Sequence, residues 1–139
     1  MEFSYKIDGG DFTHAGEASS HLKKILKSLN LDSSLIRRTV VALYEAEVNV
    51  VAHAWSGVIQ VNIQPNQICM DVRDSGPGIP DIELAMRKGY STASPAVREM
   101  GFGAGMGLPN IKENSDFMNI QSQEGKGTWL QIVNRIPPC

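Results

Sequence analysis

Two periods in the order of apolar and polar residues predict where helices and strands lie along this chain. Between residues 15 and 30, apolar side chains recur at the i, i+3, i+4, i+7 spacing of an amphipathic helix, at Leu22, Ile25, Leu26 and Leu29. The segment 33–54 is apolar on most sides and follows Asp32, a good capping residue. We therefore expect a long second helix over 33–54, with Gly57 ending it.

Alternation with a period of two predicts the strands. A Pro-Asn turn between two alternating segments is typical of a β-hairpin, and the turn EGKG separates a second such pair. The expected strands cover 3–9, 58–64, 67–74, 117–123 and 127–136, the first as an edge strand, with short helices at 81–88 and 109–115. Helices before a run of strands favour an α+β fold, a two-layer sandwich whose mixed, mostly antiparallel sheet is covered by helices on one face.

Length and composition set the class of protein. The 139 residues suit one domain over 1–139, and 42% hydrophobic with 20% charged residues is ordinary for a globular chain. A net charge of −2 gives no reason to expect nucleic acid or an anionic membrane as a partner. The sequence shows no signal-peptide pattern and no membrane-length apolar run, and Cys69 and Cys139 lack metal or redox spacing. We expect a reduced, cytoplasmic setting.

A run of alternating glycines, MGFGAGMGLPN over 100–110, is the densest unusual feature. The dinucleotide pattern G-x-G-x-x-G fails because it needs glycine at Met106 or Leu108, and the P-loop pattern fails because no lysine follows directly. Pro109 suits the first turn of a helix, so the run is either a set of flexible turns or an anion-binding loop before a helix. The run alone leaves both interpretations open.

Polar residues occupy one face of the long apolar helix. Glu45, Asn49 and His53 are spaced i, i+4, i+8 and therefore stack on that face. A solvent-exposed face is the simpler interpretation, but little other polar surface is available there. The amide oxygen of Asn49 suits Mg²⁺, and a carboxylate one turn earlier is placed to take a proton from a hydroxyl. For His53 a packing role is favoured over a catalytic one.

The turn DSGPGIPD over 74–81 follows a predicted strand directly. Its glycines, Gly76 and Gly78, allow backbone to approach a flat ligand closely. The carboxylate of Asp74 can accept from an exocyclic amine, which adenine offers and guanine does not offer at the same place. Taken alone, D-x-G-x-G is more often a simple turn than a binding site.

These motifs in this order, with Gly127-Thr128 in a late strand, resemble the GHKL (Bergerat-fold) ATPase superfamily over nearly the whole chain. The segments YEAEVNVVAHA, DSGPGIPDIELAMRKGYSTA and GAGMGLPNIKENSD resemble most the stand-alone serine/threonine protein kinases of bacterial partner-switching systems. The resemblance implies a histidine-kinase-like ATPase fold that binds ATP and Mg²⁺. It implies that Glu45 is the general base, Asn49 the Mg²⁺ ligand, Asp74 the adenine ligand, and Thr128 a support for that contact through water.

The resemblance also implies an ATP lid over about 88–102, with Lys88 and Arg98 as candidates for the γ-phosphate contact. The long insert YSTASPAVREMGFG departs from the shortest members of the family and leaves that assignment open. The remaining expected nucleotide contacts are His53, Gly76, Gly78, Ile79, Gly101, Gly103, Ala104, Gly105, Met106, Gly107 and Leu108.

The function implied is a Mg-ATP-dependent serine/threonine kinase that phosphorylates a hydroxyl on a small, antagonist-like partner protein, with a sigma factor as a further partner. A non-catalytic ATP-dependent binding switch is the first alternative. A split histidine kinase is less favoured because His14 and His21 lie too near the start to belong to a dimerisation helix pair. A topoisomerase-like ATPase is less favoured because no transducer domain accompanies the predicted fold. A homodimer remains open.

Overall fold

The computed structural model describes residues 1–79, 81–87 and 107–138, and the structural statements below concern those ranges. Five strands form one sheet in the order β1-β2-β3-β5-β4. Every pairing between neighbouring strands is antiparallel, so the sheet is antiparallel throughout rather than mixed. The strands are β1 (Glu2–Asp8), β2 (Ser56–Ile63), β3 (Gln67–Ser75), β4 (Phe117–Gln123) and β5 (Gly127–Arg135).

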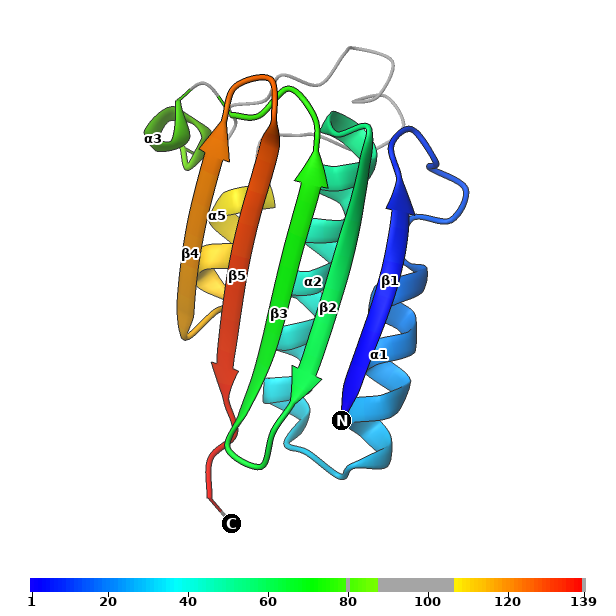
Figure 1. Ribbon diagram of the computed structural model, residues 1–139. Helices are drawn as coiled ribbons and strands as arrows, with labels where there is room; N and C mark the ends of the chain where they lie inside the picture. Colours follow the sequence, from blue (N-terminus) through cyan, green and yellow to red (C-terminus); the bar gives the residue numbers. More distant parts are fainter. Residues whose placement is uncertain (80, 88–106, 139) are drawn as a thin grey trace.

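The helices cover one face of this sheet, which gives the two layers expected from the sequence (Figure 1). Three of them lie behind the strands in that view: α1 (Glu17–Ser28), α2 (Ser33–His53) and α5 (Gly107–Glu113). The single turn α3 (Ile82–Ala85) lies at the upper end, beside β4. Within the described ranges, no helix has the length and apolarity needed to cross a membrane.

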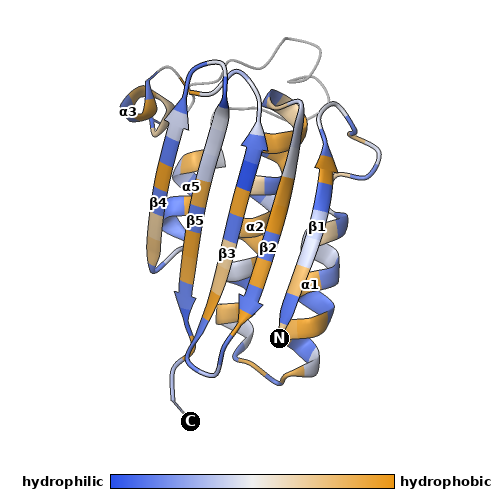
Figure 2. Ribbon diagram, in the orientation of Figure 1, coloured by the Kyte–Doolittle hydropathy of each residue, from blue (hydrophilic) through white to orange (hydrophobic). Residues whose placement is uncertain are grey.

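The core lies between the two layers. Apolar and polar residues alternate along the central strands (Figure 2), and the inward-facing side chains of β2 and β3 are buried, such as Ile59 and Met70. The predicted apolar stripe on α1 contributes Leu22 and Leu26, which are fully buried, whereas Leu29 is 38% exposed just beyond the helix. Burial of these apolar surfaces is the main stabilising term for the fold.

The ends of the elements test the predictions from sequence. Asp32 caps α2 as expected, because its Oδ2 accepts from the backbone N–H groups of Ser34 and Leu35. The prediction that Gly57 ends this helix is wrong: α2 ends at His53, and Gly57 lies within β2. A Cβ at Gly57 would lie 2.8 Å from Cγ1 of Val50, so the glycine permits close packing of strand on helix.

The two short helices also differ from their predicted ranges. The helix α5 begins at Gly107, two residues before the expected start at 109, and ends at Glu113. The helix α3 spans only Ile82–Ala85 of the expected 81–88. Both predicted hairpins, β2–β3 and β4–β5, are confirmed, as is the edge position of β1.

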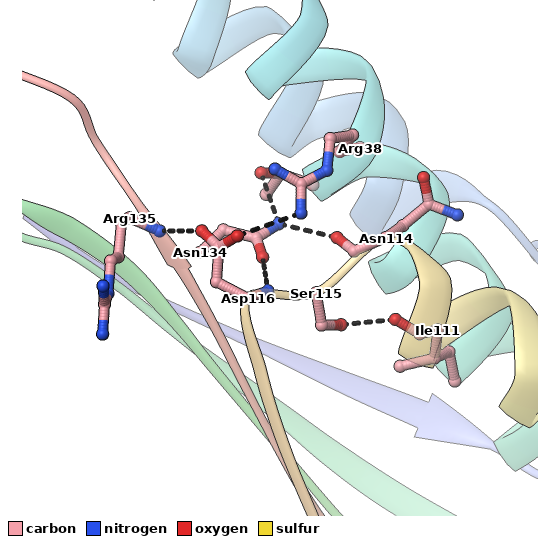
Figure 3. Close-up of polar contacts among 8 residues, drawn as sticks. Arg38, Ile111, Asn114, Ser115, Asp116, Asn134 and Arg135 are labelled. Carbon is pink, nitrogen blue, oxygen red and sulfur yellow. Dashed lines mark hydrogen bonds and ion pairs between the residues drawn. The ribbon is translucent and has the colours of Figure 1, made fainter.

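A buried amide fixes the lower end of the sandwich in Figure 1. Asn134 on β5 is fully buried, and its Nδ2 donates to Thr39 Oγ1 at 3.1 Å and to the carbonyl oxygen of Asn114 at 3.0 Å (Figure 3). Its Oδ1 accepts from the backbone N–H of Asp116 at 2.9 Å. These bonds join α2, β5 and the connection from α5 to β4, so they hold the position of α5 over the sheet.

Candidate functional site

The candidate site lies at the upper end of the sandwich in Figure 1. The end of β3, the loop that follows it and the β4–β5 turn meet at this end, and the second half of α2 runs up to it. These are the segments that carry the D-x-G-x-G turn, the Gly-Thr pair and the polar face of the long helix. Tertiary structure therefore brings together motifs that are far apart in sequence.

Glu45, Asn49 and His53 all lie on α2 and all are half-buried. The carboxylate of Glu45 accepts a hydrogen bond from the side chain of Asn110 on α5. Burial raises the pKa of Glu45, and the bond from Asn110 partly opposes this shift. Burial lowers the pKa of His53, which favours a neutral imidazole.

The amide of Asn49 lies against the first residue of α5. A Cβ at Gly107 would be 3.0 Å from Oδ1 of Asn49 and 3.3 Å from its Nδ2. The glycine thus lets the start of α5 approach this amide more closely than a larger residue allows. Among the described residues, no three His, Cys, Asp or Glu side chains are grouped to hold a metal ion. A metal ion here would therefore depend on Asn49 and on oxygen atoms of a ligand bound beside it.

Asp74, the last residue but one of β3, has one carboxylate oxygen already bonded. Its Oδ1 accepts from the backbone N–H of Thr128 at 3.0 Å, while the Thr128 hydroxyl lies 3.1 Å from Oγ of Ser122. Burial raises the pKa of Asp74, and the bond from Thr128 opposes the shift. A Cβ at Gly127 would lie 2.0 Å from the carbonyl oxygen of Asp74, which explains why glycine precedes Thr128.

The loop after β3 is held against the β4–β5 hairpin. A Cβ at Gly78, whose φ is +77°, would lie 2.5 Å from the carbonyl oxygen of Gln123. The backbone N–H of Ile79 donates to Ser122 Oγ at 2.7 Å. A Cβ at Gly76 would lie 2.9 Å from Cα of Ala54 at the end of α2. Both glycines expected to admit a ligand are thus already required by contacts within the protein.

The other predicted site residues divide into two groups. The side chain of Leu108 is 8% exposed and belongs to the core, so only its backbone is available to a nucleotide. The remaining positions lie outside the described residues: Lys88, Arg98, Gly101, Gly103, Ala104, Gly105 and Met106.

A second carboxylate on α2 was missed from the sequence. Glu47 is 1% exposed, and it accepts from the backbone N–H groups of Gly16, Ala18 and Ser19 at 3.0, 3.1 and 3.2 Å, and from Ser19 Oγ at 2.6 Å. The available signal was its spacing, since a glutamate four residues after Leu43 falls on the core face of the helix. Glu47 thus binds the start of α1 and differs in role from the half-buried Glu45.

Comparison with known proteins agrees with this geometry. Residues 10–133 match the family described as the histidine kinase-like ATPase domain, and the chain belongs to that family. It is 29% identical over 115 residues to the serine/threonine-protein kinase RsbT of Bacillus subtilis, covering 80% of each chain. It is 33% identical over 100 residues to an anti-sigma F factor of Caldanaerobacter subterraneus, covering 68% of this chain and 66% of that one.

Two solved structures share the fold. One contains the RsbU and RsbW domains of a Mycobacterium tuberculosis protein, with a TM-score of 0.67 and 17% identity over 99% of this chain and 33% of that one. The other is the mycobacterial sensor histidine kinase MprB, with a TM-score of 0.55 and 18% identity over 99% of this chain and all of that one. The antiparallel sheet with helices on one face is therefore the fold of histidine-kinase-like ATPases.

Proposed function

We propose that this chain binds Mg-ATP at the upper end of the sandwich and acts as a serine/threonine kinase of a bacterial partner-switching or anti-sigma system. One observation carries the proposal: Glu45 and Asn49 lie one turn apart on α2, half-buried, with side chains against α5. Membership of the ATPase family and the names of the relatives support it.

The donor set around Asn49 fits a magnesium ion that is held mostly by phosphate oxygens and water. Mg²⁺ prefers hard oxygen ligands and keeps several waters, so a single amide oxygen is a sufficient protein ligand when phosphates complete the shell. Gly107 lets the start of α5 lie against this amide, since a Cβ there would be 3.0 Å from Oδ1. The phosphates are assigned to this region, beside the start of α5.

Asp74 is assigned to the adenine amine. With Oδ1 accepting from the Thr128 N–H, its Oδ2 is the oxygen offered to the ligand. The backbone bond fixes the orientation of the carboxylate before any ligand arrives, which lowers the entropic cost of binding. The water-mediated support expected from Thr128 stays a prediction, and its hydroxyl lies 3.1 Å from Oγ of Ser122.

Glu45 is assigned as general base. ATP, when bound, supplies the phosphoryl group, and Glu45 takes the proton from the partner's hydroxyl. A raised pKa makes this carboxylate a stronger base than an exposed glutamate. Asn110 donates to it and so fixes the direction in which it accepts.

The partner is assigned as a small regulatory protein that bears the acceptor hydroxyl, with a sigma factor as a further partner. The cellular location is assigned as the cytoplasm. Lys88 and Arg98 remain the candidates for the γ-phosphate contact. A second candidate function, an ATP-dependent binding switch without catalysis, is favoured by the anti-sigma F factors among the relatives.

Calorimetric titration of ATP with and without Mg²⁺ tests the proposal, with N49A beside the wild type. We expect Mg²⁺-dependent binding that weakens at least about tenfold in N49A. No binding of any adenine nucleotide would reject the proposal. ADP release in the presence of serine and threonine peptides then separates kinase from switch: E45Q should keep ATP affinity and lose turnover by about 100-fold or more, while the exposed control E2Q changes neither.

A further inference from the structure

A groove of about 730 Å³ lies between α1 and α2, and Glu45 is one of the residues that line it. The helix α1 contributes Ser20, Lys23 and Lys24, and α2 contributes Val41, Tyr44 and Glu45. The groove is separate from the ATP contacts assigned above, because Asp74, Asn49 and Thr128 do not line it. The general base is the one residue assigned to catalysis that faces the groove.

The two ends of the groove differ in charge. Glu17 begins α1, and Glu45 directly follows Tyr44, whose ring would lie 3.3 Å from a Cβ on Gly16 just before that helix. Lys23 and Lys24 lie about two turns further along α1. In the part of the chain that the structure describes, no carboxylate forms an ion pair with either lysine. Their charges are therefore available to a ligand.

Between these ends the α2 side of the lining is largely apolar, whereas the α1 side carries Ser19, Ser20 and His21. Val40 and Val41 line the groove, and Tyr44 is 40% exposed beside them. An exposed aromatic side chain next to aliphatic ones is typical of a surface that receives a side chain of a partner protein. The groove thus offers two carboxylates at one end, apolar contacts from α2 in the middle and two ammonium groups at the other end.

We propose that this groove binds the acceptor segment of the protein substrate, with its hydroxyl at Glu45 and an acidic residue at Lys23 and Lys24. This deepens the proposed function and rests on it, because Glu45 is the general base only if the chain is a kinase. From Glu17, at the carboxylate end, to Lys23 and Lys24 is about 9 to 10.5 Å along α1, and an extended segment covers that distance in about three residues. The acid therefore lies about three positions from the hydroxyl.

Fluorescence anisotropy of labelled serine peptides, measured on the full chain without nucleotide, tests the groove. One set carries aspartate about three positions to either side of the serine, and the matched set carries lysine there. We expect the acidic set to bind at least about tenfold more tightly, with a preference that decreases as salt is added. The double variant K23E/K24E should reverse the preference, and Y44A should weaken the binding of both peptide sets.

The control variants are K27E, on α1 but outside the groove lining, and K6E on β1. Both should leave the preference unchanged. Equal binding of the two peptide sets, or a preference that survives K23E/K24E, overturns the proposal. A dimer in sedimentation that dissociates in K23E/K24E also overturns it, because the groove is then an interface between two copies.

The two proposals fail in different ways. If the protein prefers the acidic peptides as expected but does not bind ATP, the groove stands as a docking site and the kinase assignment fails. If ATP binds and is turned over but the protein binds both peptide sets equally, the kinase assignment stands and the groove is rejected as the binding site of the acceptor segment. ATP affinity in K23E/K24E should stay within about twofold of the wild type, because these lysines lie outside the nucleotide contacts.

Discussion

Oε1 of Glu47 accepts from the hydroxyl of Ser19 at 2.6 Å, and this buried bond joins the middle of α2 to the first turn of α1. The same carboxylate accepts three backbone N–H groups at the start of α1. No side chain caps α1 from the usual position, since its N-cap residue is Gly16. Glu47 therefore satisfies donors that a local serine or aspartate satisfies in other helices.

Replacing this carboxylate should destabilise the protein strongly. E47A leaves buried donors without an acceptor, and we expect a loss of about 3 kcal/mol in the free energy of unfolding. E47Q keeps one amide oxygen as an acceptor and should lose less. S19A removes only the hydroxyl bond and should cost about 1 kcal/mol. Urea denaturation measures all three variants, and a loss in E47A no larger than in the exposed control E2A would contradict the role.

Gly127 should tolerate alanine poorly. Its φ is +134°, and an added Cβ would lie 2.0 Å from the carbonyl oxygen of Asp74, so G127A must displace β5 from β3. We expect a loss of about 3 kcal/mol in stability. The matched control is G125A in the same hairpin, which also has a positive φ but has nothing within 4 Å of the added Cβ. It should cost about 1 kcal/mol. Thermal unfolding of both variants decides the comparison.

The pH dependence of phosphoryl transfer should report Glu45. A general base acts only when deprotonated, so turnover should rise with pH through the pKa of Glu45, which burial raises above its usual value. Removing the opposing hydrogen bond in N110A should raise this pKa further, so the acidic limb of the rate profile shifts to higher pH. Identical acidic limbs of the rate profiles in wild type and N110A would indicate that another group sets the pH dependence of turnover.

Asp116 should contribute to stability in acid. Its carboxylate accepts from the backbone N–H of Arg135 at 2.7 Å and pairs with Arg38 at 3.1 Å, and these groups, the backbone bond first, lower its pKa. Because the folded pKa lies below the unfolded one, this stabilisation is fully present above about pH 4. It is lost as the pH falls through the lowered pKa.

The variant D116N checks this sign. Wild type should be more stable than D116N above about pH 4, and the difference in melting temperature should decrease on acidification. A difference that stays constant from neutral pH to about pH 2 would show that the carboxylate does not titrate in a stabilising position. R38A removes only the smaller contribution to the lowered pKa of Asp116. The difference in melting temperature that D116N produces should therefore be smaller when Arg38 is also replaced, but it should not disappear.

Local patterns were sufficient for most of the secondary structure. The i, i+3, i+4, i+7 stripe predicted α1, Asp32 predicted the start of α2, and the Pro-Asn and EGKG turns predicted both hairpins. These features depend on neighbours in sequence, so the residues themselves carry the information. The helix face shared by Glu45, Asn49 and His53 was likewise predictable, because helical spacing alone sets it.

Contacts between distant segments were not predictable in this way. Gly57 was misassigned because its absent side chain serves packing against Val50 and does not serve a helix end. The burial of Asn134 and the helix-capping role of Glu47 each require a partner more than 25 residues away in sequence. No local pattern specifies such a partner.

The sequence by itself determined the periods of the helices and strands, their turns and caps, and the motifs that mark an ATPase of the histidine-kinase-like family. Tertiary structure alone supplied the partners that let Glu47 be buried in the core, while Glu45, two residues earlier, stays half-buried and lines the groove. The physical reason is that a polar side chain is stable in a core only where donors from another element meet it, as α1 meets Glu47.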